Sequence, residues 1–252
     1  RNIHNLMSFA PVTPQNVNSI IQNLGSMCQS VLPIFMLMRQ SCILPTLAYS
    51  SLERRAIINN ISMDGLNHPT TNSKMSAVIN KIVENKNTYK GKLVFCLFRK
   101  EMDHLASELK IKGFNPITIN GGSTERQRRS ALQCGPTDSE WTILAPKLPT
   151  DIVHFINEFL VPNVLIAQIQ TSCEGLNLQH FSEIYFTTPH WNPAVEKQAV
   201  ARCHRIGQVK PVDVYKFVTI FDKKEDNDSI SLDQYCIKVQ NIKEKMAKDC
   251  GL

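Results

Sequence analysis

The sequence predicts an α/β fold built on a mainly parallel β-sheet, and two observations indicate it. Lys92–Phe98 and Val164–Ile169 are continuous apolar runs, which are typical of strands buried on both faces of a parallel sheet. The first run is followed by an amphipathic helix that stops at Gly113, and then by a second strand at Ile117–Ile119. A strand, a helix and a strand within about thirty residues form a βαβ unit, whose crossover is expected to be right-handed.

Residues 1–71 are expected to form a helical linker or accessory region that precedes the sheet. A helical period of apolar residues is interrupted by Pro33, and a second apolar run follows at Ile34–Met38. Residues 50–71 are rich in Asn and Ser, so we expect a loop-rich connector there. The first apolar period consists of Val17, Ile20, Ile21, Leu24 and Met27.

Residues 72–220 are expected to hold the α/β domain. Strands at Glu183–Thr187 and Val212–Val218 complete its sheet, and residues 134–150 are expected to be a loop insertion. Residues 221–252 are expected to be a charged loop and a C-terminal helix with solvated lysines. The domain opens with an amphipathic helix whose apolar face consists of Met75, Val78, Ile79, Ile82 and Val83.

Composition excludes several classes of protein. The 252 residues are 42% hydrophobic and 20% charged, as in an ordinary globular protein. No run of about 18 apolar residues occurs, so we expect no membrane span. The eight cysteines lie far apart with no Cys-x-x-Cys, which argues against a metal site and favours reduced thiols. A net charge of +6 permits a nucleic-acid partner without requiring one. Because the chain starts at Arg1 without a signal pattern, it is interpreted as a fragment of a longer protein.

The stretch His190–Gln208 predicts a helix with a defined start and end. Asn192 suits the N-cap, Pro193 suits the first helical position, and Gly207 suits a left-handed exit. One face of this helix carries two guanidinium groups and an amide, which suit a polyanion, although an Arg-x-x-Arg pair also fits a solvated helix face. That face consists of Gln198, Arg202 and Arg205. The neighbouring apolar stripe consists of Val195, Ala199, Cys203 and Ile206.

The same stretch resembles motif VI of the Swi/Snf-type ATPases of helicase superfamily 2, roughly Trp-Asn-Pro followed by Gln-Ala-x-x-Arg-x-x-Arg-Ile-Gly-Gln. The resemblance implies a RecA-like three-layer fold, in which Arg202 and Arg205 act on the phosphates of ATP as arginine fingers. Gln198 belongs to the same catalytic set. This hypothesis requires both arginines to be accessible and to face the open ends of the sheet.

A second segment, Gln168–Leu178, resembles motif V of that family. Its Gly-Leu-Asn-Leu part matches well, whereas many family members have Ser-Thr-Arg-Ala-Gly-Gly where this chain has residues 168–173. The resemblance places Gly175 and Asn177 beside the nucleotide, together with the two arginines, and Thr171 beside DNA. Residues 39–45 resemble the family segment Leu-Arg-Gln-x-Cys-x-x-Pro that joins its two lobes, although a helix ending before Pro45 explains them equally well.

The Asn-Gly-Gly-Ser-Thr turn at residues 120–124 indicates a phosphate contact. Its glycines let a phosphate approach the backbone, and Thr124 with Gln127 forms a capping box at a helix N-terminus. The family has DNA-backbone contacts here, usually with Asp in place of Asn120. Trp191 is expected to be exposed, and the resemblance places it against a DNA groove. The residues assigned to DNA are Arg99, Gly121, Gly122, Thr124, Arg126, Thr171, Trp191 and Asn192.

No phosphate-binding loop Gly-x-x-x-x-Gly-Lys-Ser/Thr and no magnesium-binding acidic pair occur in the sequence. Phosphoryl transfer needs both, so the resemblance implies a second lobe that acts on ATP and Mg²⁺ held mainly by an N-terminal lobe of the same protein. The chain alone is expected to hydrolyse no ATP. The whole protein would translocate along double-stranded DNA, with chromatin or other DNA-bound proteins as further partners.

Two alternatives stay open from the sequence: a strand-separating helicase, and a non-catalytic DNA-binding or scaffold module. The expected location is the nucleus. A composition rich in Ile, Asn and Lys also fits the AT-rich genome of a large DNA virus, for which a cytoplasmic viral factory or the virion would apply.

Overall fold

The computed structural model describes residues 32–65, 67–86, 90–133, 149, 164–172, 176–208, 210–220 and 230–251. The apolar period at residues 17–27, the expected insertion except residue 149, and most of the expected charged loop lie outside the described residues. No helix in the described part of the chain is long and apolar enough to cross a membrane.

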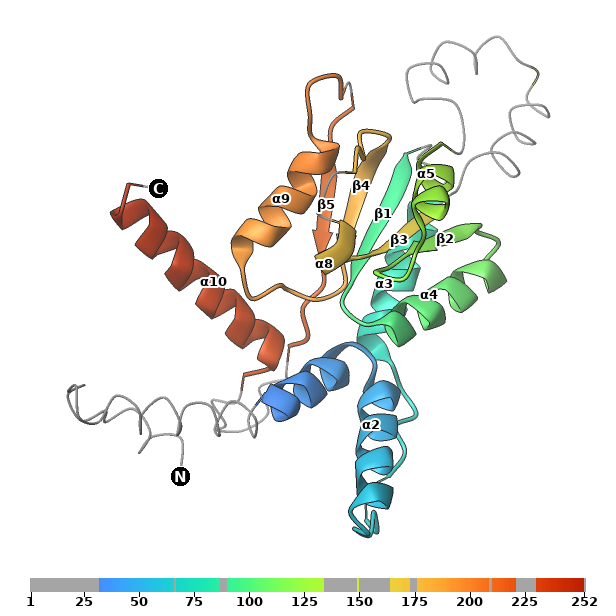
Figure 1. Ribbon diagram of the computed structural model, residues 1–252, viewed down its shortest axis with the longest axis vertical. Helices are drawn as coiled ribbons and strands as arrows, with labels where there is room; N and C mark the ends of the chain where they lie inside the picture. The colour runs from blue at the N-terminus through green and yellow to red at the C-terminus, as the bar shows by residue number, and fades with distance from the viewer. Residues whose placement is uncertain are drawn as a thin grey trace.

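A five-stranded sheet forms the centre of the molecule (Figure 1). The strand order is β2-β3-β1-β4-β5, and each neighbouring pair is parallel. The predicted α/β class with a mainly parallel sheet is therefore confirmed. The strands are β1 (Gly91–Cys96), β2 (Pro116–Ile119), β3 (Val164–Gln168), β4 (Phe181–Phe186) and β5 (Asp213–Lys216).

Helices cover both faces of the sheet. The described helices are a helix at residues 32–43, α2 (Pro45–Ile58), α3 (Ser73–Glu84), α4 (Arg99–Ile111), α5 (Glu125–Gln133), α8 (Ile169–Ser172), α9 (Pro193–Cys203) and α10 (Leu232–Asp249). Among them, α3 and α4 cover one face, α5 and α9 cover the other, and most of α2 and α10 extends beyond the sheet (Figure 1). Alternate residues of β1 face opposite sides, as a pleated strand requires. Val94 packs in a core with α3 and α4, whereas Leu93 and Phe95 pack in a second core with Ala199 of α9. Two cores around one sheet give the predicted three layers.

Residues 50–71, expected to be a loop-rich connector, begin with helix: α2 continues to Ile58, so this expectation was wrong for its first part. Pro45 stands at the start of α2, where a missing N–H costs nothing. α2 holds no Asn, and Leu52, Arg54 and Ala56 are good helix formers, so the Asn-rich composition applies only to the residues after the helix. Leu47, Ala48 and Ala56 are buried and hold the helix to the rest of the chain.

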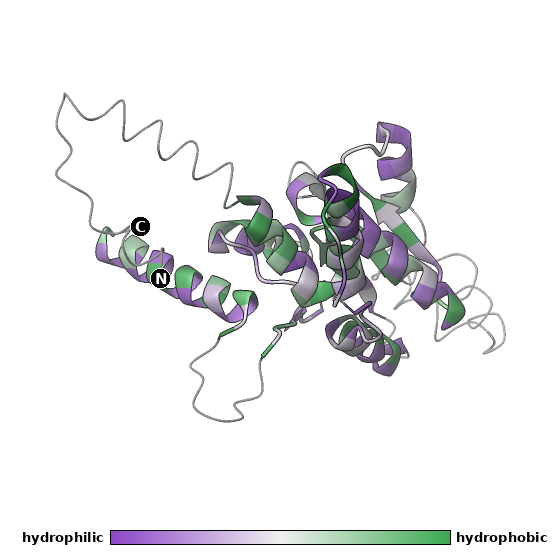
Figure 2. Ribbon diagram, turned by 90° about the horizontal axis from the view of Figure 1, so that it is seen from below, coloured by the Kyte–Doolittle hydropathy of each residue, from purple (hydrophilic) through white to green (hydrophobic). Residues whose placement is uncertain are grey.

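α10 has two unlike halves. Leu232, Cys236 and Gln240 are buried against the rest of the chain, whereas Ile242 and Met246 are exposed. Figure 2 shows polar and apolar residues alternating along this helix. The C-terminal helix is therefore anchored at its beginning and solvated at its far end.

Candidate functional site

The residues expected to contact the nucleotide and those expected to contact DNA lie at opposite edges of the sheet. The strands are parallel, so Arg99, Gly121 and Trp191 all follow carboxyl ends of strands and share that edge. α9 begins at this edge and runs back, because its last turn contacts the chain just before β4 (Figure 1). Arg202 and Asn177 therefore lie at the amino edge.

At the amino edge, hydrogen bonds from main-chain N–H groups and side-chain amides join the segment before β4 to the segment after α9. The N–H of Leu178 donates to the carbonyl of Arg202 at 3.2 Å. The amide of Gln179 donates to the carbonyl of Ile206 at 2.6 Å, and the amide of Gln208 donates back to the carbonyl of Gln179 at 2.8 Å. The Gly-Leu-Asn-Leu segment and the chain around the two arginines therefore form one connected unit.

The predicted helix is shorter at its end than expected, which changes the position of Arg205. α9 ends at Cys203, and His204 leaves helical geometry with ψ 78°. Arg205 lies in the following turn, so its expected place on one helix face with Gln198 and Arg202 was wrong. Ile206 is fully exposed and does not belong to the apolar stripe, whereas Ala199 and Cys203 are buried as predicted.

The start of α9 agrees with the prediction. The side chain of Asn192 accepts the N–H of Ala194 at 3.1 Å, with Pro193 at the first helical position. Gly207 has φ +100°, the left-handed exit expected of it. That exit lies beyond the helix, because Leu178 takes the carbonyl of Arg202, which the N–H of Ile206 would use if the helix continued.

The three residues predicted to be catalytic are accessible, as the hypothesis requires, but they do not lie at the expected edge of the sheet. Gln198 and Arg205 are exposed and Arg202 is half-buried. The arginines lie at the amino edge of β4, so the expectation that they face the open, carboxyl ends of the sheet was wrong. A nucleotide held by another lobe would reach them from the side of the molecule opposite the glycine turn.

The glycine turn after β2 is held by its own side chains. The side chain of Asn120 accepts the N–H of Gly122 at 2.8 Å, and the hydroxyl of Ser123 accepts the N–H of Asn120 at 3.0 Å. The predicted capping box is present, with the Thr124 N–H donating to Gln127 at 2.8 Å and the Gln127 N–H to the Thr124 hydroxyl at 3.3 Å. The amide oxygen of Asn120 accepts here, as a carboxylate oxygen of Asp could.

A guanidinium group lies next to this turn. Nη2 of Arg99 is 3.7 Å from the point that a Cβ on Gly122 would occupy. The side chains of Arg99, Thr124 and Arg126 are exposed. Exposed guanidinium groups beside a glycine turn and a helix N-terminus form an arrangement that suits phosphate oxygens.

Trp191 does not have the exposed position expected of it. Its ring is half-buried and meets Phe35 at 6.0 Å and Tyr235 at 5.9 Å, both edge-on. The guanidinium carbon of Arg39 lies 5.7 Å from the ring centre. The expectation failed because the partners of Trp191 come from distant parts of the sequence.

The three residues assigned to motif V are only partly described. Thr171 lies in the short helix α8 directly after β3, at the carboxyl edge, where its backbone is described. Gly175 lies outside the described residues. Asn177 is exposed, and its side chain accepts the N–H of Gln179 at 3.3 Å.

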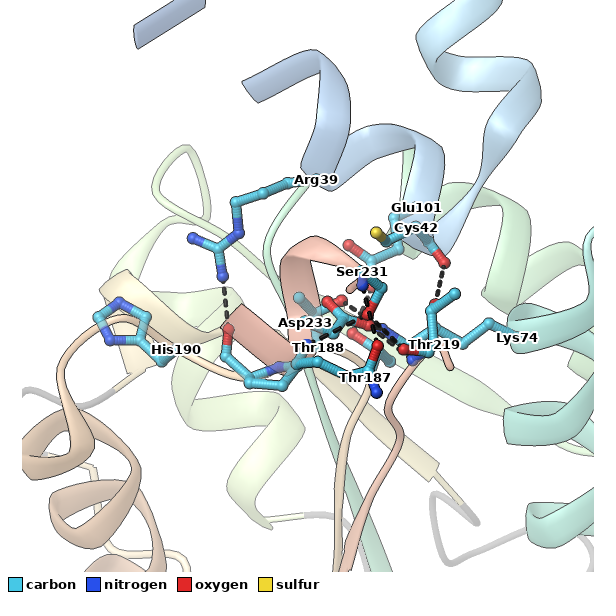
Figure 3. Close-up of polar contacts among 12 residues, drawn as sticks. Arg39, Cys42, Lys74, Glu101, Thr187, Thr188, His190, Thr219, Ser231 and Asp233 are labelled. Atoms are coloured by element: carbon cyan, nitrogen blue, oxygen red, sulfur yellow. Dashed lines mark hydrogen bonds and ion pairs between the residues drawn. The ribbon is translucent and has the colours of Figure 1, made fainter. Parts of the chain in front are cut away.

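A buried polar network at the carboxyl edge was not predicted from the sequence (Figure 3). Lys74 of α3 and Asp233 of α10 form an ion pair at 2.5 Å with side chains that are 6% and 1% exposed. Lys74 also donates to the hydroxyl of Thr188 at 3.2 Å. Burial lowers the pKa of Lys74, and the charge of Asp233 opposes this shift. A lysine beside Met75 at the start of an amphipathic helix was the available signal, but its partner lies 159 residues away.

Glu101 fixes the turn from β1 into α4. One carboxylate oxygen accepts the N–H groups of Leu97 and Phe98, each at 3.0 Å. The other lies 2.5 Å from the hydroxyl of Thr187. Burial raises the pKa of Glu101, and these hydrogen bonds oppose the shift. Glu101 therefore sets the backbone from which Arg99 projects.

Comparisons with known proteins identify the family of the chain. The helicase conserved C-terminal domain family matches residues 73–207, a range that takes in both edges described above. The chain is 30% identical over 185 residues to a SWI/SNF-related matrix-associated actin-dependent regulator of chromatin, subfamily A member 3-like 1, of Arabidopsis thaliana, covering 71% of this chain and 18% of that protein. It is 26% identical over 180 residues to the helicase-like transcription factor of Homo sapiens, covering 71% and 15%.

The chain thus spans less than a fifth of the length of these relatives. The crystal structure of the C-terminal part of the Fun30 ATPase domain aligns with a TM-score of 0.47 and 16% identity, over 77% of this chain and 61% of that one. The family match begins at the start of α3 and ends at Gly207, and the matched part carries both predicted motifs. The chain therefore belongs to the helicase conserved C-terminal domain family, as a C-terminal lobe of a superfamily 2 helicase, and it is similar to a Swi/Snf-related protein.

Proposed function

We propose that this lobe serves an ATP-driven translocase on double-stranded DNA, with Arg202 and Arg205 lent to ATP and Mg²⁺ on the N-terminal lobe of the same protein. The proposal differs from the hypothesis drawn from the sequence in one respect, because the arginines lie at the amino edge and not at the carboxyl ends of the strands. The observation that supports the revised proposal most is the division of the sheet into two edges. Exposed cations beside a glycine turn lie at one edge, and two arginines lie at the other. α9 connects the edges, so one rigid element borders both.

At the amino edge, Arg205 is exposed beside the connected unit that holds Arg202 and Asn177. A guanidinium keeps its charge at every physiological pH and binds phosphate oxygens with a fixed fork of donors. Supplying such a group to the transferring phosphate is worth about 10³ to 10⁵ in rate, or roughly 4 to 7 kcal/mol. Closure of the two lobes would therefore switch hydrolysis on, and the isolated chain would be inactive.

At the carboxyl edge, the contacts are to the DNA backbone rather than to bases. Arg99, Arg126 and the Gly121–Gly122 turn offer donors that any sequence of phosphates can use. Thr124 and Thr171 border the same edge. Trp191 and Asn192 are already used in aromatic contacts and in capping α9, so the structure favours them less as DNA contacts. DNA across both lobes would favour closure, and cycles of closure would move the protein along the duplex.

The relatives are named as a regulator of chromatin and as a helicase-like transcription factor. We therefore place this protein in the nucleus, acting on chromatin or on other DNA-bound proteins. Strand separation is the second candidate activity. Displacement of a triplex-forming strand without unwinding of a duplex would favour translocation, and unwinding would favour the helicase.

The deciding experiment is DNA-stimulated ATP hydrolysis by the full-length protein with Arg205→Ala. We expect turnover to be lost while ATP binding is retained, because the first lobe holds most of the nucleotide. Lys210→Ala, a cation just beyond the motif, is the matched control and should retain turnover. Unchanged turnover in Arg205→Ala would refute the finger role, and an inactive wild-type protein would favour a scaffold module.

A further inference from the structure

Side chains from two distant helices hold the turn that starts α9. The carbonyl of Pro189 accepts from Nη2 of Arg39 at 2.6 Å. The next carbonyl, of His190, accepts from the amide of Gln240 at 2.5 Å, and the next, of Trp191, accepts from Nζ of Lys243 at 3.1 Å. Three consecutive carbonyls are thus bound by the 32–43 helix and by α10. Both helices lie outside the range that the family match covers.

Gln240 has the central place in this arrangement. It is buried, and the nitrogen that contacts His190 also lies 2.9 Å from a carboxylate oxygen of Glu196 in the first turn of α9. An amide NH₂ has two hydrogens, and here they meet two acceptors. The same oxygen of Glu196 accepts the N–H of His190 at 2.7 Å, and its other oxygen accepts from Lys216 at 2.5 Å. One side chain of α10 therefore joins the turn to α9.

The geometry points to Gln240 as a positioning residue for the two arginines, with Arg39 holding the same turn from its other side. α9 has 11 residues, which is about 16 Å of helix, so a tilt of about 4° at its start moves its end by about 1 Å. A misplacement of about 1 Å in a catalytic group can lower a rate about 100-fold. This inference rests on the proposed function, because it gives Arg202 and Arg205 their role.

Three variants of the full-length protein test it through DNA-stimulated ATP hydrolysis. Gln240→Glu puts a second carboxylate beside Glu196, and Gln240→Met removes the donors without adding a charge. Both should lower kcat at least tenfold with KM for ATP and DNA affinity unchanged, because neither nucleotide nor DNA touches Gln240. Asn241→Asp makes the same amide-to-acid change at the exposed neighbouring residue and should leave kcat unchanged.

A rescue separates positioning from loss of structure. Gln240→Lys has a chain of the same kind as Gln240→Met but keeps a donor that can reach the carbonyl of His190 and the carboxylate of Glu196. We expect it to retain most of the kcat that is lost in Gln240→Met. A change in KM without a change in kcat, or a Gln240→Lys variant no better than Gln240→Met, would overturn the inference.

Backbone amide hydrogen exchange on the 252-residue chain gives a readout that needs neither ATP nor the first lobe. Peptides spanning residues 188–195 should exchange faster in both Gln240 variants and at the wild-type rate in Asn241→Asp. Unchanged exchange would overturn the inference whatever the ATPase shows. If the wild-type protein has no DNA-stimulated turnover, the proposed function fails while the exchange result still decides whether Gln240 holds this turn.

Discussion

Lys74 and Asp233 form a buried ion pair at 2.5 Å that joins the first helix of the α/β domain to the C-terminal helix. Asp233 also accepts the N–H of Thr219 at 2.9 Å. The carboxylate therefore connects α3, α10 and the chain that leaves β5. Because removing one partner of a buried pair leaves an uncompensated charge, this contact should matter more than the exposed ion pairs of the surface.

Lys74→Met is expected to destabilise the chain by about 3 to 5 kcal/mol, since Asp233 is left buried without its cation. Adding Asp233→Asn removes that charge and keeps an acceptor for Thr219, so the double variant should recover part of the loss. Urea unfolding measures both. Lys81→Met, which breaks an exposed pair with Glu84, is the control and should change stability little. A double variant less stable than Lys74→Met alone would contradict this account.

The buried carboxyl of Glu101 should make stability depend on pH in mildly acid solution. Its pKa is raised above 4.5 by burial, so the folded chain binds more protons than the unfolded chain between pH 4.5 and the raised pKa. Stability therefore increases as pH falls through this window and decreases as pH rises through it. A protonated Glu101 can donate to Thr187, whose hydroxyl lies 3.1 Å from the carbonyl of Phe95.

Glu101→Gln should remove that dependence. The measurement is the free energy of unfolding of wild type minus variant, followed from pH 4.5 upward, so that other titrating groups cancel. We expect this difference, wild type minus variant, to decrease as pH rises and then to level off. A difference that stays constant would show that folding does not raise the pKa of Glu101.

Arg99→Ala is expected to weaken binding to duplex DNA without regard to sequence. Loss of one phosphate contact should reduce the slope of log K against log salt by about 0.9. Lys100→Ala, an exposed neighbouring cation that is not beside the Gly122 turn, is the matched control. Titration of a labelled duplex at several salt concentrations measures both slopes, and equal losses in the two variants would mean a general charge effect rather than a contact.

Gly91 approaches the neighbouring chain too closely for any side chain. A Cβ there would lie 2.4 Å from the carbonyl oxygen of His180, where β1 and β4 shift register. Gly91→Ala should therefore cost about 1 to 3 kcal/mol of folding free energy through overpacking. A Cβ on Gly122 would meet side-chain atoms and no backbone, namely Oδ1 of Asn120 at 3.3 Å and Nη2 of Arg99 at 3.7 Å, so Gly122→Ala should cost less. The reverse order in thermal unfolding would contradict the register.

Local signals predicted the sheet and the starts of helices, and non-local contacts explain the failures. The apolar runs at β1 and β3 and the Asn192–Pro193 cap act over a few residues, so they could be interpreted directly. The end of α9 could not, because the carbonyl of Arg202 is taken by the N–H of Leu178 from another part of the chain.

The pair of Lys74 with Asp233 and the surroundings of Trp191 depend on α10 and the 32–43 helix lying against the carboxyl edge. The spacing of residues in either helix does not predict where that helix packs. The arginine pair was identified from its motif, but the edge at which it lies follows only from the length and direction of α9.

Trp191→Ala tests whether the ring serves packing or DNA. The ring contacts Phe35 and Tyr235, and the Arg39 guanidinium lies over it. Removing it should cost about 2 kcal/mol, less than a fully buried aromatic ring because Trp191 is half-buried. Trp191→Phe keeps an aromatic edge for both neighbours and should cost less. In neither variant should the salt dependence of DNA binding change, because the ring faces its own chain. A Trp191→Ala protein of wild-type stability with weakened DNA binding would instead assign the ring to the groove.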